Sequence, residues 1–177
     1  MVGRKLGVRM GLVLAAVAAV VAAAIGSTAS AAGKAPIVIG YAYDAVGQMA
    51  PVDGGPVNAL SVQIKNLNAK GGIGGRQVVL KTCNTQNSKA DVAKACAANL
   101  IKQGAQVGLV TCDVDFATPA IQEFLNKGLL TIAPCIGTDQ MGPKRFGTKG
   151  KLAFSFGNVA QDEGAAMAEY AYKVKKW

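Results

Sequence analysis

The segment from Ile37 to Leu80 constrains the fold more than any other part of the sequence, because it contains the pattern of a strand, a helix and a second strand. Residues 37–39 and 78–80 are short apolar runs, as in strands that are buried on both faces of a parallel sheet. Apolar residues recur between them at spacings of three and four, which predicts a helix with one face on the sheet: Val57, Leu60, Ile64 and Leu67. The unit predicts an α/β fold in three layers, with a doubly wound, mainly parallel sheet and right-handed crossovers.

Proline and glycine mark the ends of the predicted helix. Pro56 suits a first helical position, and Gly71 suits the position after the last turn. The glycines at 71, 72, 74 and 75 follow a helix and precede a strand, whereas phosphate-binding loops have the opposite order. They therefore predict a turn and not a nucleotide site.

The N-terminus predicts an export signal. Arg4, Lys5 and Arg9 form a positive region, and the apolar run of residues 10–25 carries no charge. The small residues at 29–31 predict cleavage after Ala31, so residues 1–31 are predicted to be a signal peptide. The alternative is a retained membrane anchor, but an apolar stretch below about 18 residues is short for a stable span. No cysteine lies near the cleavage site to carry a lipid, which favours a periplasmic or secreted protein.

Charge and residue types argue against several functions. The net charge is +9, but the basic residues after the signal are spread from Lys34 to Lys176 and are not interleaved with aromatic residues, so we expect no nucleic-acid partner. The sequence has no histidine and no C-x-x-C pair, which removes the usual general base and the thioredoxin-like redox pair. We therefore expect no enzyme activity, no catalytic residue, no metal site and no cofactor.

Four segments of the chain resemble one protein family. The helix end at residues 68–80, NAKGGIGGRQVVL, resembles the turn after the first helix of periplasmic binding proteins that serve ABC importers of branched-chain amino acids, the leucine/isoleucine/valine-binding type. Residues 91–111, 124–134 and 154–171 follow in that family's order. The resemblance covers nearly all of the chain after residue 36.

The resemblance implies an extracytoplasmic solute-binding component of an ABC importer, which captures an amino acid or a related small molecule and then docks on a membrane permease. Members of the family have two α/β lobes that close on a ligand. By this comparison, residues 32–156 are expected to form the N-terminal ligand-binding lobe, of the type I periplasmic-binding-protein kind. Residues 157–177 would be the crossover and first helix of a second, truncated lobe.

The four cysteines of an exported chain predict disulfides, and Cys83, Cys96, Cys112 and Cys135 permit three connectivities. The family's order implies that the strands ending before Cys112 and Cys135 are neighbours, which favours a bridge between these two. Cys96 is expected on the inward face of its helix, within reach of Cys83. The alternative pairs Cys83 with Cys112, which is the arrangement that the resemblance to the leucine/isoleucine/valine-binding protein implies.

A ligand is expected at the carboxyl ends of the strands, where open α/β sheets bind ligands. Four loops are predicted at this edge: residues 41–55, the loop beginning at Cys83, residues 112–119 and residues 135–142. In the family, the third and fourth loops hold the carboxylate and ammonium of an amino acid. The candidate ligand-binding residues are Gln48, Met49, Asp113, Cys135, Gly137 and Thr138.

Several of these residues depart from the family's pattern. Asp113 lies where the family has a serine, and an acid here would repel a ligand carboxylate but could pair with an ammonium. Cys135 and Gly137 lie near the family's alanine and threonine, with Thr138 one place away. An extracellular ligand-sensing receptor domain of the same fold is the alternative function, and an enzyme on a doubly wound sheet is a third.

Overall fold

The computed structural model describes residues 34–87, 89–135, 137, 141–157 and 160–177. The predicted signal peptide and its cleavage site lie outside these residues. Among the helices that are described, none combines the length and hydrophobicity that a membrane span requires.

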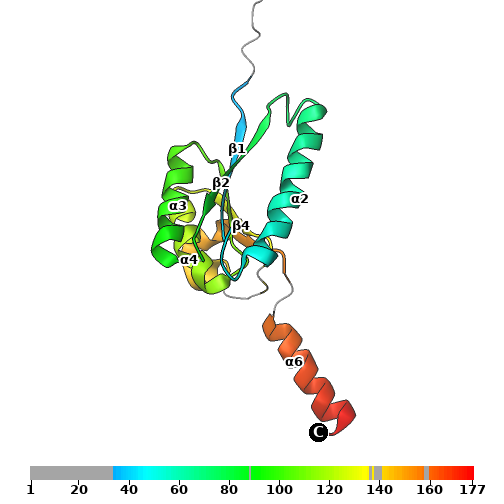
Figure 1. The fold of residues 1–177 in the computed structure, drawn as a ribbon. Coiled ribbons are helices and arrows are strands. Elements are labelled where there is room, and N and C mark those ends of the chain that lie inside the picture. The colour runs from blue at the N-terminus through cyan, green and yellow to red at the C-terminus, as the bar shows by residue number, and fades with distance from the viewer. Residues whose placement is uncertain (1–33, 88, 136, 138–140, 158–159) are drawn as a thin grey trace, which may run out of the picture. The chain divides into compact units, whose positions relative to one another are not determined.

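The described part of the chain contains a five-stranded, fully parallel sheet in the order β2-β1-β3-β4-β5 (Figure 1). The strands are β1 (Ile37–Tyr43), β2 (Val78–Asn84), β3 (Val107–Val110), β4 (Leu130–Ala133) and β5 (Ala153–Ser155). The helices are α2 (Ala50–Ala69), α3 (Ala90–Lys102), α4 (Val114–Asn126), the single turn α5 (Pro143–Phe146) and α6 (Ala160–Tyr170), with helical turns η1 (Gly147–Leu152) and η2 (Ala171–Lys175). The predicted α/β class and the mainly parallel sheet are confirmed.

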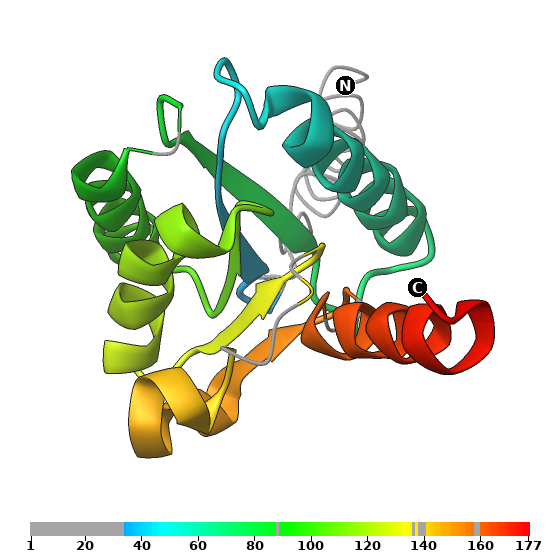
Figure 2. The same cartoon turned by 90° about the horizontal axis from the view of Figure 1, so that it is seen from below.

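Helices cover both faces of the sheet. Figure 2 shows α3 and α4 on one side of the strands and α2 on the other. Helix α2 packs against β1 and β2, whereas α3 packs against α4 and the same two strands, and α4 also covers β3 and β4. This is the three-layer arrangement that the first strand-helix-strand unit predicts.

The main core lies between the sheet and the helices α3 and α4. Its largest fully buried apolar side chains are Leu100, Val110, Ile121, Phe124 and Leu125. Two glycines on the strands let these helices approach closely. A Cβ at Gly40 would lie 3.0 Å from the Cβ of Leu100 in α3, and a Cβ at Gly108 would overlap the ring of Phe124 in α4.

The opposite face of the sheet becomes more exposed toward β5. Tyr41, Leu109, Ile132 and Phe154 are paired in register across four strands, so their side chains share one face. Tyr41 is 1% exposed beside α2, Leu109 and Ile132 are partly buried, and Phe154 is 50% exposed. The apolar surface of this face is therefore only partly covered by the described helices.

Helix α2 begins six residues before the position that the sequence predicts, so the prediction of Pro56 as a first helical residue is wrong. Pro51 takes a position in the first turn, where a missing N–H costs no helical hydrogen bond, and Pro56 lies inside the helix. The backbone carbonyl of Met49 accepts the N–H groups of Val52 and Asp53, which fixes the earlier start. Of the predicted apolar face, Ile64 is buried, whereas Leu67 is 38% exposed.

The predicted glycine turn is confirmed. The N–H of Gly72 donates to the carbonyl of Leu67 and that of Gly71 to Asn68, as at a helix end with left-handed residues. Gly71, Gly72, Gly74 and Gly75 all have positive φ. A side chain would strain each of these positions, and the chain then enters β2.

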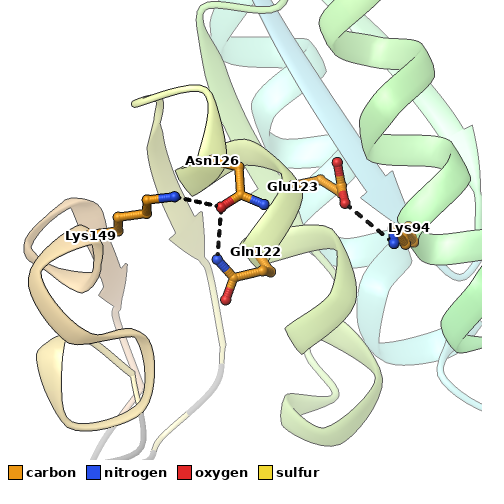
Figure 3. Close-up of polar contacts among 5 residues, drawn as sticks. All are labelled: Lys94, Gln122, Glu123, Asn126 and Lys149. Carbon is orange, nitrogen blue, oxygen red and sulfur yellow. Dashed lines mark hydrogen bonds and ion pairs between the residues drawn. The ribbon is translucent and has the colours of Figure 1, made fainter.

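Polar contacts on the surface join α3, α4 and η1 (Figure 3). Lys94 Nζ lies 3.7 Å from Glu123 Oε1, and Lys149 Nζ donates to Asn126 Oδ1 at 2.8 Å. Gln122 donates to the same oxygen at 3.1 Å. Exposed pairs of this kind contribute little to stability, so the buried apolar contacts hold these elements together.

We predict that Gly108→Ala destabilises the protein by about 1–3 kcal/mol, because the added methyl group overlaps the buried Phe124 ring. Urea unfolding followed by circular dichroism measures the effect. The matched control is Gly54→Ala, since Gly54 lies in α2 with no atom within 4 Å of an added Cβ. The control should be neutral or more stable by up to about 1 kcal/mol. Equal stability of Gly108→Ala and the wild type would contradict the close packing.

Candidate ligand-binding site

The carboxyl ends of the parallel strands meet at one edge of the sheet, where open α/β sheets bind ligands. The first loop there is shorter than predicted. Strand β1 continues to Tyr43 and α2 begins at Ala50, so this loop is only residues 44–49.

The third loop is also shorter than predicted, because α4 begins at Val114 and contains Pro119. The carbonyl of Asp113 accepts the N–H of Ala117 at 2.8 Å, which starts the helix. Burial of Ile121 and Phe124 in the core stabilises α4 despite the missing N–H of the proline. The loop that remains between β3 and α4 is residues 111–113.

Asp44, the first residue after β1, is fully buried and its carboxylate collects backbone N–H groups. Oδ1 accepts from Gly47 at 2.8 Å, from Asn87 at 3.0 Å and from Val46 at 3.3 Å. Oδ2 accepts from Met49 at 3.2 Å. This carboxylate therefore fills a cradle of amides that could otherwise hold an anion.

The remaining amides of the first loop are also occupied by side chains. Asn84 Oδ1 accepts the N–H of Ala45 at 3.1 Å, and Asn87 Oδ1 accepts that of Gln48 at 3.0 Å. The N–H of Asp44 itself donates to Asp53. Every backbone N–H from residue 44 to residue 49 thus has an acceptor, so this loop can contact a ligand only through its side chains and carbonyl groups.

Asp53 connects two strand ends. It lies fully buried in the first turn of α2, where a carboxylate is favoured by the helix dipole. Its Oδ2 accepts the N–H of Asp44 at 2.7 Å, directly after β1, and its Oδ1 accepts the N–H of Cys112 at 2.8 Å, just after β3.

The surroundings shift the pKa values of two groups at this edge. Burial acts to raise the pKa of the Asp44 carboxyl, but the amides of Gly47, Asn87, Val46 and Met49 outweigh it and hold this pKa below its usual value. Burial is the main cause that raises the pKa of Tyr41 far above its usual value, and the negative charge of Asp53 and the neighbouring Tyr43 add to it. The Tyr41 hydroxyl is buried and finds no hydrogen-bond partner among the described residues.

Five of the six predicted ligand-binding residues lie in the described part of the chain. Gln48 is exposed, and Met49 is half-buried at the start of α2. Asp113 and Gly137 are half-buried in the third and fourth loops, and the carbonyl of Gly137 accepts the N–H of Ala160 at 3.0 Å. Cys135 is exposed. Thr138 lies outside the described residues.

Both preferred disulfides are present, and the alternative bridge between Cys83 and Cys112 is not. Cys83 is bonded to Cys96 with their Cα atoms 5.5 Å apart, which joins the end of β2 to α3. Cys112 is bonded to Cys135 with 5.0 Å between Cα atoms, which joins the ends of β3 and β4. Two of the candidate ligand-binding loops are thus linked covalently.

Sequence reasoning missed Asp44 and Asp53. An acid directly after a buried strand was a usable signal for Asp44, because strand ends in parallel sheets carry polar side chains that satisfy loop amides. Asp53 had no such signal, since it lies in a segment expected to be loop. Its contacts depend on residue 112, far along the sequence.

A hollow of about 700 Å³ lies elsewhere, against α6 and the last turn of the chain. Its walls are apolar and are formed by Ala166, Met167, Ala168, Tyr170, Ala171 and Trp177. None of these residues comes from the strand ends. Among the residues that the structure describes, no cluster of histidine, cysteine or acidic side chains could hold a metal ion.

The parallel sheet, with helices on both faces, is a three-layer α/β fold. The chain belongs to the periplasmic binding protein family, because the sequence profile of the family described as "Periplasmic binding protein" matches residues 36–177. No curated protein matches the chain.

Several solved structures share the fold. A periplasmic binding protein type 1 from Bordetella pertussis is 21% identical with a TM-score of 0.68, over 78% of this chain and 38% of that chain. The branched-chain amino acid transporter substrate binding protein of Streptococcus pneumoniae, solved with isoleucine, is 21% identical with a TM-score of 0.61 and the same coverage. A putative branched-chain amino acid ABC transporter from Silicibacter pomeroyi is 20% identical with a TM-score of 0.63, over 80% of this chain and 36% of that chain. This chain therefore spans less than two fifths of the length of these proteins.

We predict that Asp44→Asn lowers stability at pH 7 by about 2 kcal/mol or more, because its amide nitrogen cannot accept the loop N–H groups. The lowered pKa of Asp44 means that its stabilising effect is complete above the unfolded-state pKa of about 3.9 and is lost as pH falls through the folded-state pKa. The stability difference between wild type and variant should therefore shrink from pH 7 to pH 3.

Urea unfolding at the two pH values measures this difference. Asp91→Asn is the matched control, since Asp91 is an exposed acid in the first turn of α3. A difference between wild type and Asp44→Asn that stays constant from pH 7 to pH 3 would contradict the charged state of Asp44.

Proposed function

We propose that this chain is part of an extracytoplasmic solute-binding component of an ABC importer, which captures an amino acid, of the branched-chain type, or a related small molecule. The observation that carries the proposal is the family match over residues 36–177, together with a parallel sheet whose loops gather at one edge. The family and the structural neighbours are substrate-binding proteins and not enzymes. In this function, the chain binds its ligand without catalysis and without a cofactor.

The ligand would lie at the carboxyl edge of the sheet. We propose that the side chains of Gln48 and Met49 contact it from the first loop, and that Asp113, Cys135, Gly137 and Thr138 do so from the third and fourth loops. Occupied amides in the first loop support a role for side chains there. The acid at position 113 favours a ligand with an ammonium group.

The export signal in residues 1–31 would bring the protein to the periplasm or the cell exterior, where it would deliver its ligand to a membrane permease. We further propose that residues 32–156 form the ligand-binding lobe and that residues 157–177 belong to a second lobe. The exposure of α6 supports this division, since none of its residues is buried and Met167 and Tyr170 are both more than half exposed.

Titration of isotope-labelled protein with leucine, followed by amide chemical shifts, tests the proposed function. We predict shift changes at residues 44–49, 112–113 and 137, with a dissociation constant weaker than about 1 mM, because one lobe supplies only part of the ligand contacts. Shift changes confined to α6 would contradict the site. Micromolar affinity would contradict the requirement for a second lobe.

The charge at position 113 has a separate consequence. We predict that leucinamide, which lacks the carboxylate, binds the wild type at least as tightly as leucine does. Asp113→Asn should shift the preference toward leucine by about fivefold, or ~1 kcal/mol, as for a partly exposed ion pair. Glu123→Gln is the matched control, because Glu123 lies in the last turns of α4 and should leave the preference unchanged. An unchanged preference in Asp113→Asn would show that Asp113 does not contact the ligand.

A further inference from the structure

Three strand ends at the candidate site are connected by two buried carboxylates. Asp53 reaches from α2 to the backbone after β1 and to the backbone after β3. Asp44 continues the connection to the loop after β2, because its Oδ1 accepts the N–H of Asn87. The side chains of Asp44 and Asp53 are both 0% exposed, which strengthens the hydrogen bonds that their oxygens accept.

The loop after β2 has a conformation that needs such support. Gln86 and Asn87 have φ values of 52° and 64°, in the left-handed region that residues other than glycine rarely adopt. Their N–H groups donate to Asn84 Oδ1 and Asp44 Oδ1 at 2.9 and 3.0 Å. These two acceptors compensate for the cost of two consecutive left-handed residues.

The first loop and the loop after β2 pack closely at Gly47. A Cβ at Gly47 would overlap the side chains of both Asn87 and Asp44. The first loop and the loop after β2 are therefore in direct contact at this point, and a side chain at position 47 would push them apart.

We propose that Asp53 and Asp44 are positioning residues that assemble the ends of β1, β2 and β3 into one preformed edge before any ligand arrives. As a statement about ligand binding, this inference rests on the proposed function. The connection fixes the loop that carries Gln48 and Met49 and the backbone next to Asp113. A ligand that meets this edge does not have to order these loops, so less conformational entropy is lost on binding.

Amide hydrogen exchange of the purified, disulfide-bonded chain tests the proposal without any ligand, so its outcome is independent of whether the chain binds leucine. Asp53→Asn keeps the size of the side chain but replaces one acceptor oxygen with an N–H donor. We expect exchange at the N–H of Asp44, of Cys112 or of both to become about tenfold faster or more. Exchange in the middle of the strands, at Ala42 and Val110, should accelerate much less than at Asp44 and Cys112.

A second variant gives a different expected pattern. Asp44→Asn should accelerate exchange at its own donors, Val46, Gly47, Met49 and Asn87, more than at Cys112, because Asp53 still accepts the N–H of Cys112. Asp91→Asn, the exposed acid at the start of α3, is the control and should change none of these amides.

Two results would overturn the proposal. In the first, Asp53→Asn leaves both Asp44 and Cys112 at their wild-type exchange rates, which would mean that the carboxylate does not hold the strand ends. In the second, Asp53→Asn accelerates Ala42 and Val110 as much as Asp44 and Cys112, or the variant does not fold. Asp53 would then stabilise the whole domain and would have no separate role in positioning the edge.

Discussion

Strand β1 is the element on which the rest of the structure depends, because its backbone pairs with both β2 and β3. One face of β1 packs against α3 at Gly40, and the other places Tyr41 beneath α2. Its carboxyl end is held by the carboxylate of Asp53, which also binds the backbone after β3. The hydrogen bonds of the sheet and the buried carboxylate thus fix the same strand at its middle and at its end, which gives the candidate ligand edge a rigid base.

The ligand groups that this edge can bind depend on which of its backbone N–H groups already donate hydrogen bonds within the protein. In the first loop, the carboxylates of Asp44 and Asp53 and two asparagine side chains already accept every N–H, so main-chain donors are not free to bind an anionic ligand group. The loops after β3 and β4 are joined by the Cys112–Cys135 disulfide, which limits how far they can separate. In the proposed function, recognition at this edge would therefore depend on side chains such as Gln48 and Asp113.

Sequence patterns predicted the elements that local periodicity determines. The apolar runs located β1 and β2, and the four glycines located the turn before β2, because each signal lies within a few neighbouring residues. The starts of α2 and α4 were missed, because each helix contains a proline that suggested a later start. Contacts with distant residues stabilise the earlier start: Asp53 of α2 accepts a backbone N–H after β3, and Ile121 of α4 is buried in the core. The Cys112–Cys135 bridge was found because the strand order implied by the family resemblance brings these cysteines together. The Cys83–Cys96 bridge was found because Cys96 was expected on the inward face of its helix.

The parallel pairing also determines the order in which this fold can form. Parallel neighbours cannot be joined by a tight turn, so each pairing must wait for a whole crossover segment to be present. Strand β1 comes first in the sequence but gains its second neighbour only when residues 107–110 arrive, after both β2 and α3. The closing of this long loop is the slow kind of step that limits folding rates, and until then Tyr41 and Ala42 lack the β3 partners that help to bury them.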